Sequence, residues 1–200
     1  MMKTFLLTAL LFCLATTIFA QDIELPAPQR TGGKPIFDAI NERESYKDPA
    51  ETPIDLQSIS DLLWVAYGFN REDRRVVPSA MNQQELFVYV ILKEGTYLYD
   101  ASVNKLILKA KGDHRKNAGM QDYVYVAPVN LIYVVDQSKG TGTGAYISCG
   151  CAAQNVYLAC ASKGLGCAVR TSINKEDLQK LLQLTDQQEP IAGQTIGHKK

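Results

Sequence analysis

Histidine is scarce in this sequence, and the short motifs that usually mark an enzyme are missing. The 200 residues include two histidines, His114 and His198, and neither has a serine or cysteine nearby in an arrangement typical of nucleophilic catalysis. A G-x-G-x-x-G fingerprint is lacking, and the glycine-rich residues 140–144 do not include the lysine of a P-loop. The sequence therefore argues against a histidine-based triad and against both of these nucleotide-binding loops.

An excess of one charge is lacking too. Lys and Arg total 21, Asp and Glu also total 21, and no polybasic tract occurs. A surface that binds nucleic-acid phosphates or anionic lipids normally carries a basic excess. Hydrophobic residues make up 46% of the chain, which is sufficient for a full core. These values predict one globular domain with no nucleic-acid partner.

Long hydrophobic runs are absent except at the N-terminus. Lys3 supplies positive charge, residues 5–19 are almost wholly apolar, and Ala20 is a small residue before Gln21. This pattern is typical of a secretory signal peptide, and the run is short for a bilayer core of about 30 Å. We therefore expect an exported protein, periplasmic or otherwise extracytoplasmic, with no stable membrane insertion after cleavage. The predicted division is a signal peptide at 1–20, an extended segment at 21–33 and a folded domain at 34–200.

Four cysteines remain after the predicted cleavage, and an exported protein can join such residues in disulfides. Cys149 and Cys151 point to different faces of a predicted helix, and Cys160, nine residues after Cys151, lies opposite it. A zinc site is disfavoured, because a C-x-C pair diverges on a helix and no histidine is close in sequence. We interpret the cysteines as small buried residues that pack a helix. A long-range disulfide of Cys167 stays open, and no metal site is predicted.

Helical and strand patterns are mixed along the chain, which predicts the α+β class. Pro35 suits the first turn of a helix that ends near Glu42, and Asp55 can cap a second helix that Gly68 ends. The charged residues 69–77 are predicted to be a loop. The other predicted elements are strands at 86–92, 131–136, 167–172 and 189–197, a hairpin of 96–100 with 105–109, and helices at 144–164 and 175–184.

The segment 144–164 differs from the other predicted helices. It is apolar on most of its circumference and rich in small residues. A helix that is apolar nearly all round is normally buried, and small residues let another backbone approach closely. We expect a central helix, with a partner subunit as one candidate neighbour.

Two short segments carry side chains that could hold a ligand. Arg43, Ser45 and Lys47 alternate, so in an extended segment they face one way, and two cations with a hydroxyl suit a phosphate and its adjoining polyol. A solvated basic face at a helix end is the plainer interpretation. Further along, Asn82 and Gln84 offer amides that both donate and accept, as the edge of a planar heterocycle requires. Ordinary turn chemistry is the alternative there.

In their order along the chain, these motifs resemble the flavin-dependent nitroreductase family. The order is Arg43-x-Ser45-x-Lys47, then Pro78-Ser79-x-x-Asn82-x-Gln84, then a helix with Gln154-Asn155 that ends at Gly164-Leu165-Gly166. The resemblance covers about residues 34–200. Residues 62–68, followed by Arg75 and Pro78-Ser79-Ala80, are similar to the branch that contains the thiazole/oxazole-forming peptide dehydrogenases.

The resemblance implies a nitroreductase-like fold. Its features are a central mixed or antiparallel sheet flanked by helices, a long buried central helix, and a homodimer with FMN at the subunit interface. The first motif would hold the FMN phosphate and ribityl chain, and Lys199 or Lys200 would add a phosphate contact. The second motif would approach the flavin from the partner subunit. The resemblance implies no particular catalytic acid or base. The predicted cofactor-binding residues are Arg43, Ser45, Lys47, Pro78, Ser79, Asn82, Gly164, Gly166 and Lys199.

The implied function is that of an exported FMN-dependent oxidoreductase. Hydride transfer through flavin N5 would reduce a small nitro, quinone or similar acceptor. NAD(P)H as the electron donor stays open, because reduced nicotinamide is plentiful in the cytoplasm and an exported enzyme must obtain electrons elsewhere or act as an oxidase. The alternatives are a flavin-binding or structural module without turnover, and a peptide-modifying dehydrogenase that acts with a partner.

Overall fold

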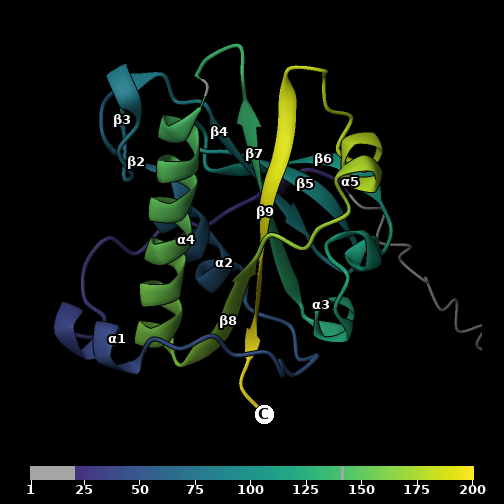
Figure 1. Ribbon diagram of the computed structural model, residues 1–200. Coiled ribbons are helices and arrows are strands. Elements are labelled where there is room, and N and C mark those ends of the chain that lie inside the picture. The colour runs from purple at the N-terminus through teal and green to yellow at the C-terminus, as the bar shows by residue number, and fades with distance from the viewer. Residues whose placement is uncertain (1–20, 141) are drawn as a thin grey trace, which may run out of the picture.

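A seven-stranded sheet forms the centre of the computed structural model, which describes residues 21–140 and 142–200 (Figure 1). The strand order is β1-β6-β5-β4-β7-β9-β8, and each neighbouring pair is antiparallel. The strands are β1 (Ile23–Glu24), β4 (Leu86–Ile91), β5 (Gly95–Asp100), β6 (Lys105–Lys111), β7 (Val129–Asp136), β8 (Leu165–Arg170) and β9 (Gln188–His198), with β2 (Phe69–Arg71) and β3 (Arg74–Arg75) in a separate hairpin. The predicted α+β class is confirmed.

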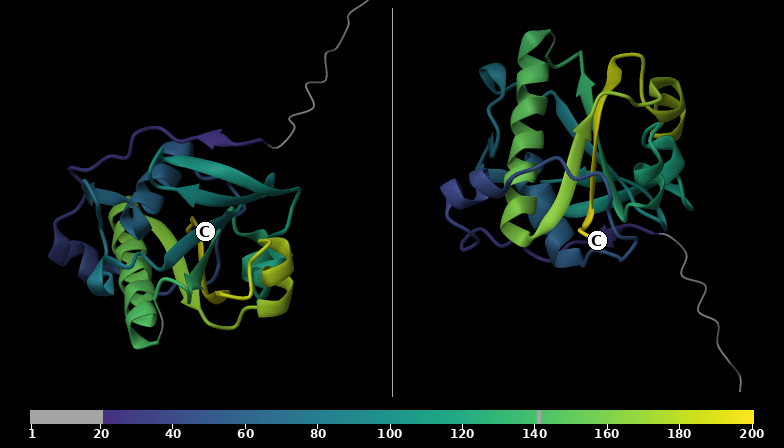
Figure 2. Two further views of the ribbon diagram at one scale, coloured as in Figure 1. Left: turned by 90° about the horizontal axis from the view of Figure 1, so that it is seen from above. Right: turned by 60° about the horizontal axis from the view of Figure 1, so that its bottom comes forward.

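Helices cover both faces of the sheet. They are α1 (Ile36–Glu42), α2 (Leu56–Tyr67), α3 (Asp122–Val126), α4 (Thr143–Lys163) and α5 (Lys175–Leu181). The helices α2 and α4 pack into one apolar core, and α3 and α5 pack into a second core on the other face. Figure 2 shows α4 and α5 on opposite sides of the strands β8 and β9.

The alternation of side chains in β7 explains how one strand serves both cores. Leu131 and Tyr133 point into the core beneath α4, whereas Ile132 and Val134 point into the core beneath α5. Successive side chains of a strand face opposite sides, so a strand covered on both sides reads as a continuous apolar run. The predicted buried strands at 86–92 and 131–136 are confirmed as β4 and β7.

The ends of the predicted helices follow from their capping residues. Asp55 caps α2, because its carboxylate accepts from the backbone N–H of Ser58 at 2.8 Å, and this hydrogen bond lowers the pKa of Asp55. Asn174 caps α5 in the same way through Asp177. This last helix ends at Leu181, earlier than predicted, and Gln183 adopts a left-handed conformation with φ of 56° just beyond it.

The prediction of a loop over residues 69–77 is wrong, because β2 and β3 form a short hairpin there. Its strands are too short and too charged to show a strand pattern. The hairpin is held by Arg75, whose guanidinium lies 3.9 Å from the ring centroid of Phe69 and 4.5 Å from that of Tyr67. Stacking of a guanidinium on aromatic rings is a tertiary contact, which sequence periodicity does not reveal. The short elements β1 and α3 were also not predicted.

The central helix is confirmed as α4, and in a single chain its burial is one-sided. Ala152, Val156 and Cys160 are at most 1% exposed, whereas Tyr146 and Ile147 are 58% and 57% exposed. One side of the helix therefore packs on the sheet, and the other presents large apolar side chains to solvent.

The four cysteines have free thiols in the structure, as the packing interpretation expects. Cys149, Cys160 and Cys167 are buried, and burial raises the pKa of Cys149 to about 12. A thiol with so high a pKa is seldom a thiolate and reacts slowly. The long-range disulfide of Cys167 that the sequence left open is not formed in this structure.

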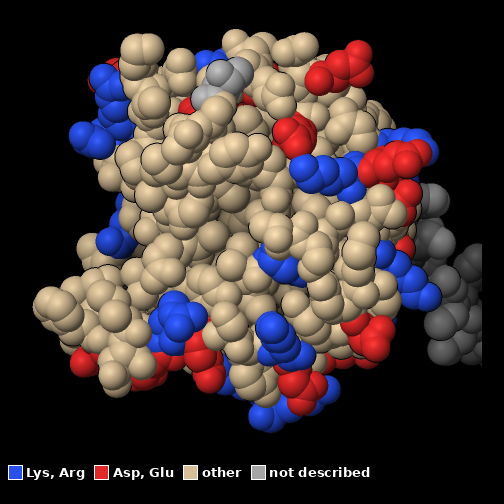
Figure 3. Space-filling view, viewed as in Figure 1, with Lys and Arg blue, Asp and Glu red and all other residues tan. Residues whose placement is uncertain are grey.

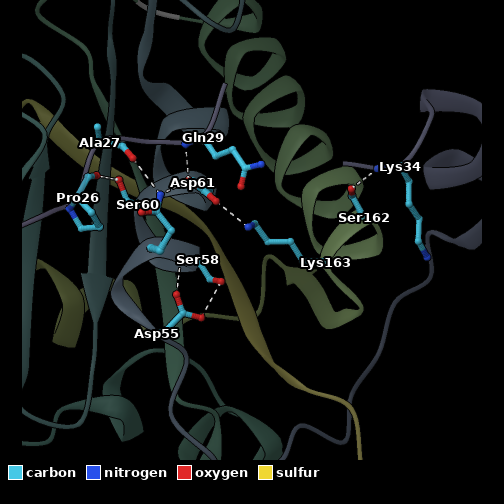
Figure 4. A network of polar contacts seen from close by, with 11 residues as sticks. Pro26, Ala27, Gln29, Lys34, Asp55, Ser58, Ser60, Asp61, Ser162 and Lys163 are labelled. Carbon is cyan, nitrogen blue, oxygen red and sulfur yellow. Dashed lines mark hydrogen bonds and ion pairs between the residues drawn. The ribbon is translucent and has the colours of Figure 1, made fainter. Parts of the chain in front are cut away.

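The residues between the predicted cleavage site and α1 form an anchored strap, which we define as residues 21–34. It begins as β1 on the edge of β6 and then crosses α2 and the C-terminal end of α4 (Figure 4). The backbone N–H of Gln29 donates to Asp61 at 2.7 Å, and that carboxylate also forms an ion pair with Lys163 at 2.6 Å. The backbone N–H of Lys34 donates to Ser162 at 2.8 Å. The strap is therefore part of the folded domain.

The predicted signal peptide, residues 1–20, lies outside the described residues. In the part of the chain that the structure covers, no helix is long and apolar enough to span a bilayer.

Candidate active site

The Arg43-x-Ser45-x-Lys47 segment leaves α1 in an extended conformation and runs beside α4 and β8. The guanidinium of Arg43 lies 5.2 Å from the centroid of the Tyr157 ring, and the hydroxyl of Ser45 lies 2.8 Å from the Tyr157 hydroxyl. The Tyr157 oxygen also accepts from the backbone N–H of Val169 at 2.9 Å. One tyrosine of the central helix thus fixes both Arg43 and Ser45, which lie together as predicted from their alternation.

Lys47 lies on a different depression, a cavity of about 670 Å³ beside the edge strand β8. We call it the edge cavity, and its polar lining consists of Lys47, Asp48, Gln121, Asp122, Tyr123, Arg170, Ser172 and Lys200. A smaller groove of about 290 Å³ runs between α4 and β8 and includes Tyr157. Val169 lines both depressions. Of the motif, Lys47 lines the edge cavity, whereas Arg43 and Ser45 contact Tyr157 beside the groove.

The amide of Gln121, a residue of the edge-cavity lining, has one polar atom without a partner. Its nitrogen donates to the hydroxyl of Ser172, whereas its carbonyl oxygen is buried and has no hydrogen-bond partner. Exchanging the two ends of the amide would leave the nitrogen unpartnered instead. A buried polar atom without a partner is costly, and a ligand that donates or accepts at this point would remove the cost.

The C-terminal lysines approach the same region, and both are paired with carboxylates. The ammonium of Lys199 lies 2.6 Å from Glu44, and that of Lys200 lies 2.5 Å from Asp48. Exposed ion pairs of this kind contribute about 0–1 kcal/mol, so an anionic ligand can compete for the lysines at little cost. Figure 3 shows basic and acidic side chains side by side below the largely uncharged surface over α4.

The Pro78-Ser79-x-x-Asn82 loop lies toward the other end of α4. The Ser148 hydroxyl oxygen lies 3.1 Å from the carbonyl oxygen of Pro78. Ser148 and Tyr157 are nine residues apart, which places them about 13 Å apart along the helix axis and on opposite sides of it. A single chain therefore does not bring this loop to Arg43 and Ser45. The expectation that it reaches the flavin from a partner subunit stays a prediction.

A buried carboxylate holds this loop in place. Glu85 is 1% exposed, and its two oxygens each accept a hydrogen bond at 2.6 Å, one from Ser79 and one from Ser148. The Ser79 oxygen in turn accepts from the backbone N–H of Gln84 at 2.8 Å. Burial raises the pKa of Glu85, but the hydrogen bonds from Ser148 and Ser79 outweigh this effect and lower it below its usual value.

We expect Glu85→Ala to lower the free energy of unfolding by about 2–3 kcal/mol, because it removes two hydrogen bonds to a buried carboxylate and leaves a cavity in place of the side chain. Glu85→Gln should cost less than about 1 kcal/mol. Its amide oxygen can accept from Ser79, and its amide nitrogen can donate to Ser148, which then donates to the carbonyl of Gly144, 3.1 Å away. Urea unfolding of both variants measures the difference, and equal losses would refute this role.

The two predicted glycines have structural explanations. Gly164 ends α4 in the left-handed conformation, with φ of 70°. Gly166 lies under the ring of Tyr46, where a Cβ atom would come within 2.5 Å of the ring. Neither feature requires a ligand, and cofactor contact by Gly164 and Gly166 stays a prediction.

The residues that sequence analysis missed are those that build the two hollows. They are Tyr157, which fixes Arg43 and Ser45, and Gln121, Arg170 and Ser172 in the edge cavity. Arg170 carried a usable signal, because a charged residue inside an apolar strand is rarely buried without a reason. Gln121 carried none. Among the described residues, no group of His, Cys, Asp and Glu is placed to bind a metal ion.

Comparison with known proteins identifies the family. The model of the nitroreductase family matches residues 40–198. A nitroreductase-like protein of Ralstonia eutropha JMP134 has a solved structure that is 35% identical in sequence, with a TM-score of 0.84, and the match covers 92% of this chain and 91% of that one.

Two more distant structures share the fold. One is a chain of the E. coli microcin synthetase McbBCD complex, with 18% identity and a TM-score of 0.71 over 99% of this chain and 85% of that chain. The other is a nitroreductase-like protein of Desulfovibrio desulfuricans in complex with FMN, with 20% identity and a TM-score of 0.61 over 84% and 87% of the two chains. The match of the family model to most of the sequence, together with the 35% identity of the Ralstonia protein, shows that this chain belongs to the nitroreductase family.

Proposed function

We propose that this protein is an exported FMN-dependent oxidoreductase that reduces a small nitro, quinone or similar acceptor. The observation that carries the proposal is the edge cavity, where Lys47 and Lys200 lie in one lining with Gln121, whose amide oxygen has no hydrogen-bond partner. Its volume of about 670 Å³ is in the range of cofactor pockets. The FMN complex of the Desulfovibrio structure adds support.

The side chains in and beside the edge cavity suit both the phosphate end and the ring end of FMN. Lys47 and Lys200 would bind the phosphate, with Lys199 in reach once its ion pair with Glu44 opens. Arg43 and Ser45 contact Tyr157, whose hydroxyl also binds the backbone of Val169 in the cavity lining, and they would contact the phosphate or the adjoining polyol. The free polar atom of Gln121 would pair with the edge of the ring. FMN itself supplies the redox chemistry, and the protein supplies position and electrostatics.

The proposal includes a homodimer, because a single chain leaves apolar surface uncovered next to the site. Phe37 of α1 is 81% exposed, and Tyr146 and Ile147 of α4 are 58% and 57% exposed. Exposed apolar residues on neighbouring helices are typical of a subunit interface. Association through this face would bring the Pro78-Ser79-x-x-Asn82 loop of the partner subunit toward the edge cavity.

Two alternatives belong to other classes of function. A flavin-binding or structural module without turnover would bind FMN and stay oxidised with every electron donor. A peptide-modifying dehydrogenase would act with a partner protein, and the fold likeness to a chain of the McbBCD complex favours this alternative over the first.

Export is part of the proposal as well. The N-terminal sequence of the mature protein, recovered from the extracytoplasmic fraction, should begin near Gln21.

An anaerobic spectrum tests the proposed activity. The mature protein, loaded with FMN, is mixed with NADH or NADPH, and the flavin absorption near the visible maximum is followed. Bleaching, with recovery on addition of a quinone or nitroaromatic, supports a nicotinamide-dependent reductase. Flavin that binds and does not bleach with nicotinamide, but bleaches with dithionite, points to another donor or to an oxidase. Absence of bound flavin would refute the proposal.

A further inference from the structure

Arg170, at the end of β8, is a buried cation whose partners are all neutral. It is 7% exposed. Its guanidinium donates to the carbonyl of Ala118 at 2.8 Å, to the hydroxyl of Thr195 at 2.5 Å and, at 3.4 Å, to the amide oxygen of Asn130. These contacts join β8 to β7, β9 and the segment before α3, and none of them supplies a negative charge.

The charge of Arg170 also lacks a counter-ion within the chain. In the part of the chain that the structure covers, no carboxylate lies within ion-pair distance of it. Its Nε has no hydrogen-bond partner and packs against Gly119, where a Cβ atom would come within 2.4 Å of it. Burial lowers the pKa of Arg170 to about 10, so the group is still charged near neutral pH. Buried charges are normally paired, because removing a charge from water is expensive.

The buried charge of Arg170 lies in the wall of the edge cavity. Arg170 lines the edge cavity together with Gln121 and Ser172. The other charges on the lining are Lys47, Asp122 and the pair of Asp48 with Lys200. A charge buried in the wall acts on the cavity through a medium of low dielectric constant, and is therefore felt more strongly than an exposed lysine.

We propose that Arg170 supplies the positive charge that makes the edge cavity prefer reduced FMN over oxidised FMN. This inference rests on the proposed FMN site. The oxidised ring is neutral. Uptake of two electrons and one proton from an added reductant gives a ring with one negative charge, which is the counter-ion that Arg170 lacks. A cation near the ring is one of the ways in which a protein tunes flavin electronics.

A purely structural role for Arg170 makes a different prediction. That role depends on the hydrogen bonds to Ala118 and Thr195, whereas the proposed role depends on charge. Arg170→Lys keeps the charge and loses the fork of donors, and Arg170→Gln keeps an amide donor and loses the charge. The two variants are therefore matched controls for each other.

The experiment measures the midpoint potential of FMN bound to the wild-type protein and to both variants, by stepwise reduction with dithionite in the presence of a reference dye. The difference between the potentials of bound and free FMN gives the ratio of the dissociation constants of the oxidised and reduced forms. We expect Arg170→Gln to lower this ratio about tenfold or more, as one charge at close range in a partly buried site implies, and Arg170→Lys to change it much less.

Four outcomes would count against the inference. An unchanged ratio of dissociation constants in Arg170→Gln, or an equal fall of the ratio in both variants, would overturn the role of Arg170. The proposed FMN site would still stand in that case, provided that the wild type binds FMN. Failure of the wild type to bind FMN would refute the proposed site itself. If the variants do not fold, the wild type still gives an answer at mildly acidic pH. Uptake of one proton with two electrons by the bound ring supports the inference, and uptake of two protons contradicts it.

Discussion

Replacing Lys163 by methionine is expected to lower the free energy of unfolding by about 2–3 kcal/mol, because the change leaves a buried carboxylate without its cation. Asp61 is 4% exposed and lies 2.6 Å from the Lys163 ammonium. It keeps its hydrogen bonds from Gln29 and Gln57 in the variant, and we therefore expect less than the full cost of an isolated buried charge. Urea unfolding of the mature protein measures the loss.

The matched control is Lys180→Met, which removes an ion pair with Glu176 between side chains that are 72% and 79% exposed. Such a surface pair contributes about 0–1 kcal/mol, so this variant should unfold nearly like the wild type. Equal losses in the two variants would contradict the role given to Lys163 in anchoring the strap to α4.

The loss in Lys163→Met should also depend on pH. Burial raises the pKa of Asp61, but hydrogen bonds from Lys163, Gln29 and Gln57 outweigh it, so the pKa in the folded protein lies below 3.8. A carboxyl group with a lowered pKa stabilises the fold above its unfolded pKa, and the contribution is lost as pH falls through the folded value. Without Lys163, fewer interactions oppose the effect of burial on the pKa of Asp61, so the carboxyl group of the variant is protonated at a higher pH than that of the wild type. The difference in free energy of unfolding between Lys163→Met and the wild type should therefore shrink as the pH falls below about 4.

Replacing Arg43 and Lys47 together by alanine is expected to weaken FMN binding by about a hundredfold or more. Each charge-assisted hydrogen bond to a phosphate contributes about 1.5–3 kcal/mol. Lys47 lines the edge cavity, and Arg43 lies over the ring of Tyr157, which lines the neighbouring groove. The single variants should each lose about tenfold. Quenching of FMN fluorescence on titration with the apoprotein gives the dissociation constants.

Riboflavin provides the control for this experiment, because it has the same ring and no phosphate. The double variant should bind riboflavin about as well as the wild-type protein does. A similar loss for riboflavin and FMN would mean that Arg43 and Lys47 support the fold of the site, and would remove the phosphate assignment. Lys180→Ala, on the exposed side of α5, should leave both affinities unchanged.

Much of the fold could be predicted because its signals are local. Asp55 and Gly68 mark the two ends of α2, and the apolar runs that become β4 and β7 are long enough to be identified without tertiary information. The hairpin over 69–77 could not be predicted, because Arg75 holds it by stacking on Tyr67 and Phe69. The extended segment at 21–33 was predicted, but its anchoring was not, since Lys34 binds Ser162, which lies 128 residues away in the sequence.

Only the part of the candidate site that consists of short sequence motifs could be predicted. Arg43 and Ser45 lie together because two residues of an extended segment share a side, which their spacing indicates. Their common partner Tyr157 looks like any apolar residue of a helix. The edge cavity is assembled from Gln121 before α3, Arg170 at the end of β8 and Lys200 at the C-terminus, and no local pattern connects such distant positions.

Titration of the mature apoprotein with FMN tests the central claim most directly. The account predicts saturable binding of one FMN per chain, seen as quenching of flavin fluorescence together with a shifted visible spectrum that persists after gel filtration. Flavin that stays free in solution, with unchanged fluorescence and no absorption eluting with the protein, would contradict the assignment of the edge cavity as a flavin site.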